Sequence, residues 1–254
     1  MPEPLAHSTP EGIANKNSSA FVLPDAAKLE AMAEFAAGAG HEINNPLATI
    51  IGRAQQLLKD ERDPRRRQMI QAIGAQAYRI RDMIGDAMLF GRPPLPEIGE
   101  VELSSAITDV VTRLRDSLTE SNCQVSDQVP LDLVIRADRT QLAILFAELI
   151  RNSRDALQPR GGEIQIRART MDHQFVRVEV EDHGRGFTEA ERVHAFDPFF
   201  SGRQAGRGLG FGLPKCWQII RQHGGRIEIE SIPDAATTVR IDWPVSENER
   251  PPST

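Results

Sequence analysis

Residues 41–46 of the chain, with the sequence HEINNP, place a histidine directly before a carboxylate, and two amides and a proline follow. The imidazole of His41 is a competent nucleophile near neutral pH because much of it is unprotonated. Glu42 is a candidate base beside it. Pro46 has no amide hydrogen, so a helix here loses its hydrogen bond to the carbonyl of residue 42 and can bend. The segment therefore predicts a nucleophile, a base and a hinge within two helical turns.

A second pair of polar residues lies further along the chain, on a segment whose apolar residues have helical spacing. Glu148 and Asn152 are four residues apart, so their side chains share one face of the helix. Carboxylate and amide oxygens are the ligands that Mg²⁺ prefers. The pair suits a magnesium site, although taken alone it fits an exposed polar stripe better.

A carboxylate and two glycines follow an alternating, strand-like run. In the pattern Asp182-x-Gly184-x-Gly186, the aspartate ends the strand. It can accept a hydrogen bond from the exocyclic amine of a base, and the glycines allow the backbone to approach the ring closely. A pattern this short is, on its own, often only a turn.

Aromatic residues at 196–200 precede a glycine-rich stretch that contains Gly208, Gly210 and Gly212 and leads into Pro214. Proline suits the first turn of a helix, and the amides at a helix N-terminus bind anions, so phosphates fit here. The glycine content also suits a lid that closes on a nucleotide. The glycines do not follow a strand in a βαβ unit, which excludes a dinucleotide-binding site, and no P-loop lysine is present, which excludes a P-loop. The phenylalanines fit core packing equally well.

Two long helices are expected to carry the histidine segment. Asp25 is a candidate N-cap, residues 60–63 interrupt the pattern, Pro64 suits a new helix start, and the second helix is expected to end near Gly91. Apolar residues recur at steps of three or four in both helices. These seams comprise Leu29, Met32, Ala36, Ala39, Ile43, Leu47, Ile50, Ala54 and Leu57 in the first helix, and Ile70, Ile73, Ala77, Ile80, Ile84 and Ala87 in the second.

Such a hairpin cannot cover its own apolar seams. Two copies can form a four-helix bundle, which predicts a homodimer. The alternative is that the seams pack against the downstream part of the same chain. The arginines at 65–67 are interpreted as a solvated helix end, with a docking contact for an acidic partner as the alternative.

The remainder of the chain predicts an α/β sandwich, with one mixed sheet covered by helices on one face. We expect a flexible tail at 1–24, the hairpin at 25–91, a stiff proline-rich linker at 92–98, the sandwich at 99–246 and a flexible tail at 247–254. Helices are expected near 104–120, 138–158 and from Leu213, and strands near 123–129, 133–137, 163–169, 175–181, 226–232 and 238–243.

Composition narrows the class of protein. The net charge of -6 argues against a general affinity for nucleic acid. No apolar run approaches the roughly 18 residues of a membrane span, and the N-terminus lacks a signal-peptide pattern, so we expect a cytoplasmic protein. The two cysteines are far apart and indicate neither a metal site nor a disulfide framework. Because few residues precede the first helix in this sequence, we expect no folded sensor domain within the residues before it.

Together these motifs resemble the conserved boxes of two-component sensor histidine kinases. Each box is weak alone, but five in the family's order are specific, and they extend over roughly residues 25–245. Residues 41–46 resemble the H box, Asn152 the N box, 182–186 the G1 box, 196–200 the F box and 208–213 the G2 box, and 223–225 match a His-Gly-Gly that the family often has.

The resemblance implies a dimeric four-helix bundle followed by a GHKL-type ATP-binding sandwich, with ATP and Mg²⁺ as cofactors. His41 would attack the γ-phosphate, with Glu42 accepting or orienting the proton on the other ring nitrogen. The phosphoryl group would pass to an aspartate of a response-regulator receiver domain, and Asn45 matches the position that orients water for dephosphorylating that partner. The metal would be held by Asn152 and Glu148, and the nucleotide by Asn152, Asp155, Asp182, Gly184, Gly186, Phe200, Gly208, Leu209, Gly210, Gly212 and Leu213.

Three positions depart from the family's pattern. Glu148 stands where an asparagine is usual, which implies either extra support for Mg²⁺ or some direct hydrolysis of ATP. His183 replaces an asparagine. Asp155 stands where a phosphate-contacting cation is common, and Arg154, Arg203 or Arg207 are candidate substitutes. Two alternatives to a kinase follow: a degenerate module that binds nucleotide or a receiver without chemistry, and a chaperone-like ATPase suggested by Glu148.

Overall fold

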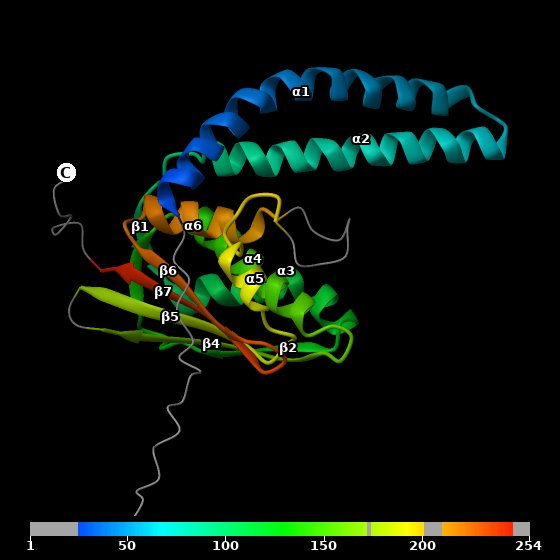
Figure 1. Ribbon diagram of the computed structural model, residues 1–254. Helices are drawn as coiled ribbons and strands as arrows, with labels where there is room; N and C mark the ends of the chain where they lie inside the picture. Colours follow the sequence, from blue (N-terminus) through cyan, green and yellow to red (C-terminus); the bar gives the residue numbers. More distant parts are fainter. Residues whose placement is uncertain (1–24, 172–173, 201–209, 246–254) are drawn as a thin grey trace, which may run out of the picture.

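A computed structural model describes residues 25–171, 174–200 and 210–245 of the 254-residue chain. A long helical hairpin lies over an α/β sandwich (Figure 1). Both predicted tails lie outside the described residues, and so do the predicted lid residues Arg203, Arg207, Gly208 and Leu209. No helix in the described ranges combines the length and apolar character needed to cross a bilayer.

The hairpin consists of α1 (Ala26–Asp60) and α2 (Pro64–Gly91). The predicted N-cap Asp25 is confirmed, since it accepts a hydrogen bond from the amide of Lys28, and α2 starts at Pro64 as predicted. Asp63, which was not predicted as a cap, caps α2 directly before Pro64. The guanidinium of Arg67 donates to the carbonyl of Leu58 over 2.9 Å and so satisfies the free end of α1. The arginine cluster therefore belongs to the helix junction.

Five strands form one mixed sheet in the order β2-β4-β5-β7-β6. β2 runs parallel to β4, and the other neighbours are antiparallel. Alternate residues are buried, and the opposite face carries ion pairs such as Arg177–Asp242, at 2.7 Å. The strands are β2 (Cys123–Gln128), β4 (Gly162–Thr170), β5 (Phe175–Asp182), β6 (Arg226–Ile232) and β7 (Ala236–Pro244).

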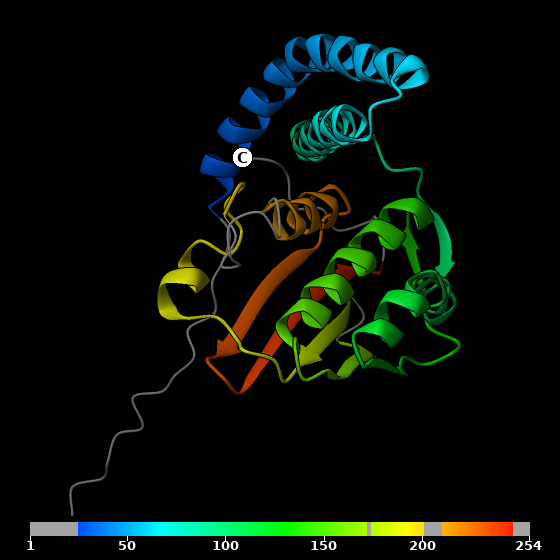
Figure 2. The same ribbon diagram turned by 90° about the vertical axis from the view of Figure 1, so that its right-hand side faces the viewer.

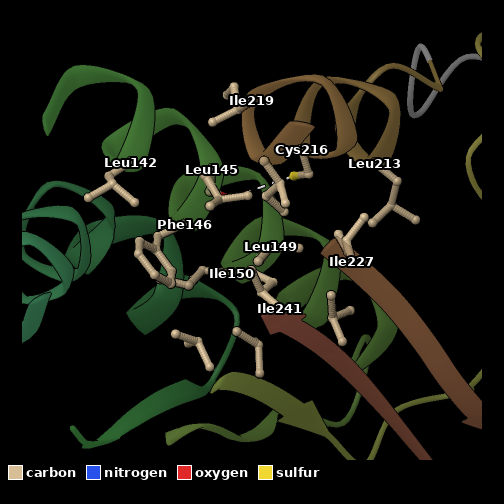
Figure 3. Close-up of a cluster of buried hydrophobic side chains, with 14 of the residues drawn as sticks. Leu142, Leu145, Phe146, Leu149, Ile150, Leu213, Cys216, Ile219, Ile227 and Ile241 are labelled. Carbon is tan, nitrogen blue, oxygen red and sulfur yellow. Dashed lines mark hydrogen bonds between the residues drawn. The ribbon is translucent and has the colours of Figure 1, made fainter. Parts of the chain in front are cut away.

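Helices cover one face of this sheet, as predicted, and Figure 2 shows them between the sheet and the hairpin. They are α3 (Leu103–Glu120), α4 (Arg139–Ala156) and α6 (Gly212–Gln222). Figure 3 shows side chains of α4 and α6 meeting those of β6 and β7 in the core. The thiol of Cys216 points at the carbonyl of Leu145 in this core, at 3.8 Å. The core therefore fixes α4 against α6, and these two helices carry the predicted site residues Glu148, Asn152, Asp155, Gly212 and Leu213.

Two details differ from the prediction. The strand near 133–137 is not part of the large sheet: β3 (Val134–Ala137) pairs with β1 (Gly99–Glu102) in a separate two-stranded sheet. β3 is short because Asp138, which follows it, caps α4 and also accepts the amide of Glu97. A short helix, α5 (Glu189–Val193), was also not predicted, although Thr188 and Glu191 form a capping box at its start.

The hairpin divides its apolar residues between two environments. Leu29 and Ala33 of α1 and Ala87 and Phe90 of α2 are buried in the same core as the sandwich. The Phe90 ring lies 6.2 Å from that of Phe211. Further along, Leu47, Ile51 and Ala77 form a second cluster between the two helices. The seam residues that stay exposed include Ile50, Leu57 and Ile73. The alternative in which the seams pack on the downstream part of the chain thus holds only for the end near the sandwich.

Candidate functional site

A cavity of about 350 Å³ opens between α4, α6, the segment after β5 and the edge of α2. Most residues predicted from separate motifs line this one space, although they are far apart in the sequence. Gly184 does not line it, and Asp86 of α2 and Lys215 of α6, which the motifs did not indicate, do. The predicted residues on the wall are Glu148, Asn152, Asp155, Asp182, Gly186, Phe200, Gly210, Gly212 and Leu213.

Asp182 ends β5 on the cavity wall and is 3% exposed. Burial raises the pKa of its carboxyl, and hydrogen bonds from the Ser153 side chain and the Gly184 amide, the latter at 3.0 Å, only partly offset that rise. Two donors therefore hold the carboxylate in place while it faces the cavity. Such a buried acceptor suits the exocyclic amine of a base.

The glycines after Asp182 make a tight turn. Gly186 has a φ of 65°, and a Cβ there would lie 2.5 Å from the carbonyl oxygen of Ile232. Gly184 packs against the carbonyl of Ala156 at the end of α4 in the same way. The two interpretations of this motif are thus compatible, because the turn is what presents Asp182 to the cavity.

The aromatic segment separates into three roles. Phe196 is buried, as the core interpretation expected, whereas Phe200 lines the cavity. Phe199 has a φ of 66°, is exposed, and meets Phe211 edge-on with ring centroids 4.7 Å apart. Phe211 directly precedes α6, so this contact joins the aromatic segment to the start of that helix.

Glu148 and Asn152 present oxygen atoms to one point of the cavity wall. A Cβ added to Gly212 would lie 3.2 Å from Oε2 of Glu148, and 3.3 Å and 3.5 Å from Nδ2 and Oδ1 of the Asn152 amide. The pair is half-buried beside a glycine that leaves the space open, so the exposed-stripe alternative is wrong. In the described part of the chain no three acidic, histidine or cysteine side chains gather as a metal site. Two oxygens fit Mg²⁺, which completes its shell with phosphate and water.

Lys215 holds the other oxygen of Glu148. Its Nζ lies 2.6 Å from Oε1 of Glu148 and 2.9 Å from Oδ1 of Asp86, and its side chain is 7% exposed. Burial alone lowers the pKa of the ammonium, but the two ion pairs outweigh burial and raise it. The ammonium of Lys215 therefore occupies Oε1 of Glu148, and Oε2 is the oxygen that lies beside Gly212.

Arg154, one of the candidates for the phosphate-contacting cation, forms an ion pair with its neighbour Asp155. Arg154 donates to Oδ1 of Asp155 over 2.7 Å, and both residues line the cavity. Of the three candidate arginines, this is the one within the described residues. His183 is exposed, lies 3.6 Å from Glu181 and does not line the cavity.

The histidine segment lies on α1, and the His41 side chain is outside the described part of the structure. Glu42 and Asn45 are exposed and do not line the cavity. The turn they belong to packs on α2: the Asn44 amide lies 3.4 Å from the sulfur of Met88, and a Cβ at Gly40 would collide with the same side chain. Met88 follows the cavity residue Asp86 by two positions, so this turn of α1 and the cavity lie at the same level of the hairpin.

His223 has a structural place. Its Nδ1 lies 2.8 Å from the carbonyl of Ile219, its Nε2 accepts the amide of Asp138 over 3.1 Å, and its ring packs on Trp243. Burial lowers the pKa of the imidazole, which keeps it neutral. This histidine fastens the end of α6 to the start of α4.

Two protein families match the chain. Residues 31–94 match the family described as His Kinase A (phospho-acceptor) domain. Residues 137–247 match the family described as histidine kinase-, DNA gyrase B-, and HSP90-like ATPase. The first match contains the histidine segment and the second contains every other predicted motif.

The chain is also similar to curated proteins and to solved structures. The chain is 33% identical over 206 residues to the sensory histidine kinase/phosphatase NtrB of Escherichia coli O157:H7, and 28% identical over 225 residues to sporulation kinase E of Bacillus subtilis (strain 168). These alignments cover 77% and 87% of this chain but only 58% and 29% of the relatives. Full-length ShkA in complex with AMPPNP has the same fold, with a TM-score of 0.69 at 19% identity over 84% of this chain and 46% of ShkA. Histidine kinase ThkA in complex with response regulator TrrA has a TM-score of 0.62 at 24% identity over 88% of this chain and 65% of ThkA.

Proposed function

The chain belongs to the two-component sensor histidine kinases, of whose catalytic core it contains both domains, and from this premise we propose that it phosphorylates His41 from ATP and passes the phosphoryl group to an aspartate of a response regulator. ATP is the substrate of the sandwich, and the hairpin is the acceptor. Because ATP supplies the group, we place the reaction in the cytoplasm.

In this proposal the cavity residues hold the nucleotide. Asp182 accepts a hydrogen bond from the adenine amine, and the turn at Gly186 and the amides at Gly210 and Gly212 border the base and phosphates. Bound at Asn152 and Glu148, Mg²⁺ would neutralise charge on the phosphates. Arg154 adds a cation on the same wall.

A nitrogen of His41 would form the new bond to the γ-phosphorus as the bond to the leaving oxygen of ADP breaks. Glu42 would take or orient the proton on the other ring nitrogen, and Pro46 would let α1 bend after His41. Asn45, exposed on the same helix, would orient water for the reverse task of dephosphorylating the receiver. The names of two proteins are consistent with these partners: NtrB is a kinase/phosphatase, and ThkA was solved with a response regulator.

One observation carries the proposal: residues from four separate motifs line a single cavity, and the turn of α1 that holds the histidine lies at the level of that cavity. A nucleotide-binding module without chemistry would need the cavity alone. It would not need an acceptor helix fastened beside it through Met88 and Asp86.

The wild-type chain should incorporate label from ATP carrying it on the γ-phosphate, in a bond that acid breaks and alkali does not. Changing Asn152 to Ala should lower that incorporation by on the order of 10²-fold or more, because a metal-holding oxygen is lost. Label counted on gel-separated protein gives the result. Incorporation that is unaffected by Asn152→Ala would contradict the placement of the metal.

A homodimer would cover the apolar seam that this hairpin leaves exposed. Ile50, Leu57 and Ile73 are 45%, 61% and 56% exposed. Introducing Ile50→Asp and Ile73→Asp together should place charges in the shared core of the four-helix bundle and give monomers in sedimentation experiments. Leu131→Asp, at an exposed apolar position of the sandwich, is the matched control and should leave the mass unchanged. A dimer that survives the double change would show that the copies meet elsewhere.

A further inference from the structure

A buried lysine joins three elements at the edge of the cavity. Lys215 lies in the first turn of α6, Glu148 lies on α4, and Asp86 lies on α2 of the hairpin. Its ammonium donates to both carboxylates, over 2.6 Å and 2.9 Å. One positive charge is therefore shared between the nucleotide domain and the acceptor hairpin.

The Glu148 carboxylate also faces two ways. Its Oε1 contacts Lys215, with Arg151 at 3.7 Å, while its Oε2 lies beside Asn152 at the open point above Gly212. A cation held by Oε2 and Asn152 would thus be separated from the lysine ammonium only by the carboxylate group of Glu148. Charges a few ångströms apart inside a protein interact strongly enough to change an affinity by tenfold or more.

We propose that Lys215 is a positioning residue that sets the affinity of Glu148 and Asn152 for a divalent cation, and that Asp86 of the hairpin raises this affinity by neutralising the lysine. The inference rests on the proposed function, because the cation would accompany the nucleotide phosphates. With Asp86 in place, the lysine is balanced and opposes the cation little. When the hairpin moves away, Asp86 leaves with it, and the unbalanced ammonium repels the cation.

Coupling of this kind works in both directions. If a docked hairpin strengthens cation binding, cation binding must favour the docked hairpin by the same factor. Among the described residues, the ion pairs Lys28–Asp197 and Glu30–Arg221 also join the hairpin to the sandwich, but none of these four residues lines the cavity. Asp86 is therefore the hairpin residue through which the metal position and docking are linked.

The test compares the Mg²⁺ concentration needed for half-maximal AMPPNP binding, measured by calorimetry, in four variants of the chain. Asp86→Asn should raise this concentration by about tenfold, because the lysine is left unbalanced. Lys215→Gln should lower it, because a positive charge is gone. The double change Lys215→Gln with Asp86→Asn removes the ion pair as a unit and should return the value close to that of the wild type.

Asp82→Asn is the matched control. Asp82 lies one turn earlier on α2, is exposed, and pairs with Arg81, so its loss removes the same charge without reaching Lys215. Its value should stay within about twofold of the wild type. If Lys215→Gln does not fold, Asp86→Asn and the double change still decide the matter.

The Mg²⁺ concentration for half-maximal binding should shift in opposite directions in Asp86→Asn and Lys215→Gln, and this distinguishes the inference from a purely structural role. Damage to packing would weaken binding in both single variants, so shifts in the same direction, or no shifts, would overturn it. Mn²⁺ binding followed by electron paramagnetic resonance without nucleotide should show the same order of affinities. If that order holds in a chain that never forms phosphohistidine, the inference stands and the proposed function fails.

Discussion

Changing His41 to Gln should reduce incorporation of label from ATP by on the order of 10³-fold or more, because it removes the only group that forms the new bond. Glutamine keeps a polar side chain of similar length on α1 but has no ring nitrogen that can accept the phosphoryl group. The measurement is alkali-stable label per chain at saturating ATP. His7→Gln, a histidine loss outside the described residues, is the control and should leave labelling intact.

The same variant separates the kinase from its two alternatives. AMPPNP affinity in His41→Gln should equal that of the wild type, because the nucleotide is held by the sandwich and not by α1. Steady phosphate release that does not depend on His41 would instead favour the chaperone-like ATPase. Tight nucleotide binding by the wild type without labelling would favour the degenerate module.

Changing Asp182 to Asn should weaken ATP binding by about 10- to 100-fold, the effect of losing a hydrogen bond to a buried charged acceptor. The amide oxygen of asparagine can still accept one hydrogen bond. Its NH2 group, however, places a donor near the exocyclic amine of the base, which is itself a donor. Calorimetric titration with AMPPNP gives the result. Asp155→Asn is a useful comparison, because that carboxylate is already occupied by Arg154.

The same Asp182 variant should be more stable than the wild type at neutral pH, by about 1 kcal/mol. Burial raises the pKa of this carboxyl above its ordinary value of 3.8, so the folded state binds its proton more tightly than the unfolded state does. The stabilising contribution of the protonated form is full below 3.8 and is lost as pH rises through the raised value. Ionised Asp182 thus costs stability at pH 7, and asparagine removes that cost.

Thermal unfolding of the two chains between pH 4 and 7 checks this. The advantage of Asp182→Asn should grow as pH rises across the acidic range. An Asp182→Asn chain that is less stable at pH 7 and binds ATP as well as the wild type would contradict the role given to this residue.

Local signals made the hairpin and most of the strands predictable. Asp25 and Pro64 each set a helix end through their own backbone neighbourhood, and the structure confirms both. The alternation in β4 and β5 likewise follows from one buried and one solvated face. The types of residue that line the cavity could be predicted, because four short motifs carried residues that suit one nucleotide.

The remaining features depend on contacts between residues distant in the sequence. Lys215 is separated from Glu148 by 67 residues and from Asp86 by 129. Next to a glycine-rich stretch this lysine would be interpreted as a phosphate ligand, and only the packing of α2 and α4 against α6 shows its two carboxylate partners. β1 and β3 have four residues each, too few for a periodic pattern to establish their pairing. For α5 a usable signal existed, since Thr188 and Glu191 have capping-box spacing.

The most direct measurement is the position of the phosphoryl group after the chain has been incubated with ATP and Mg²⁺. Peptide mass spectrometry under alkaline conditions should find it on the peptide that contains His41, and brief acid treatment should remove it. A phosphoryl group on any other residue, or none in a chain saturated with nucleotide, would contradict the assignment of His41 as the acceptor.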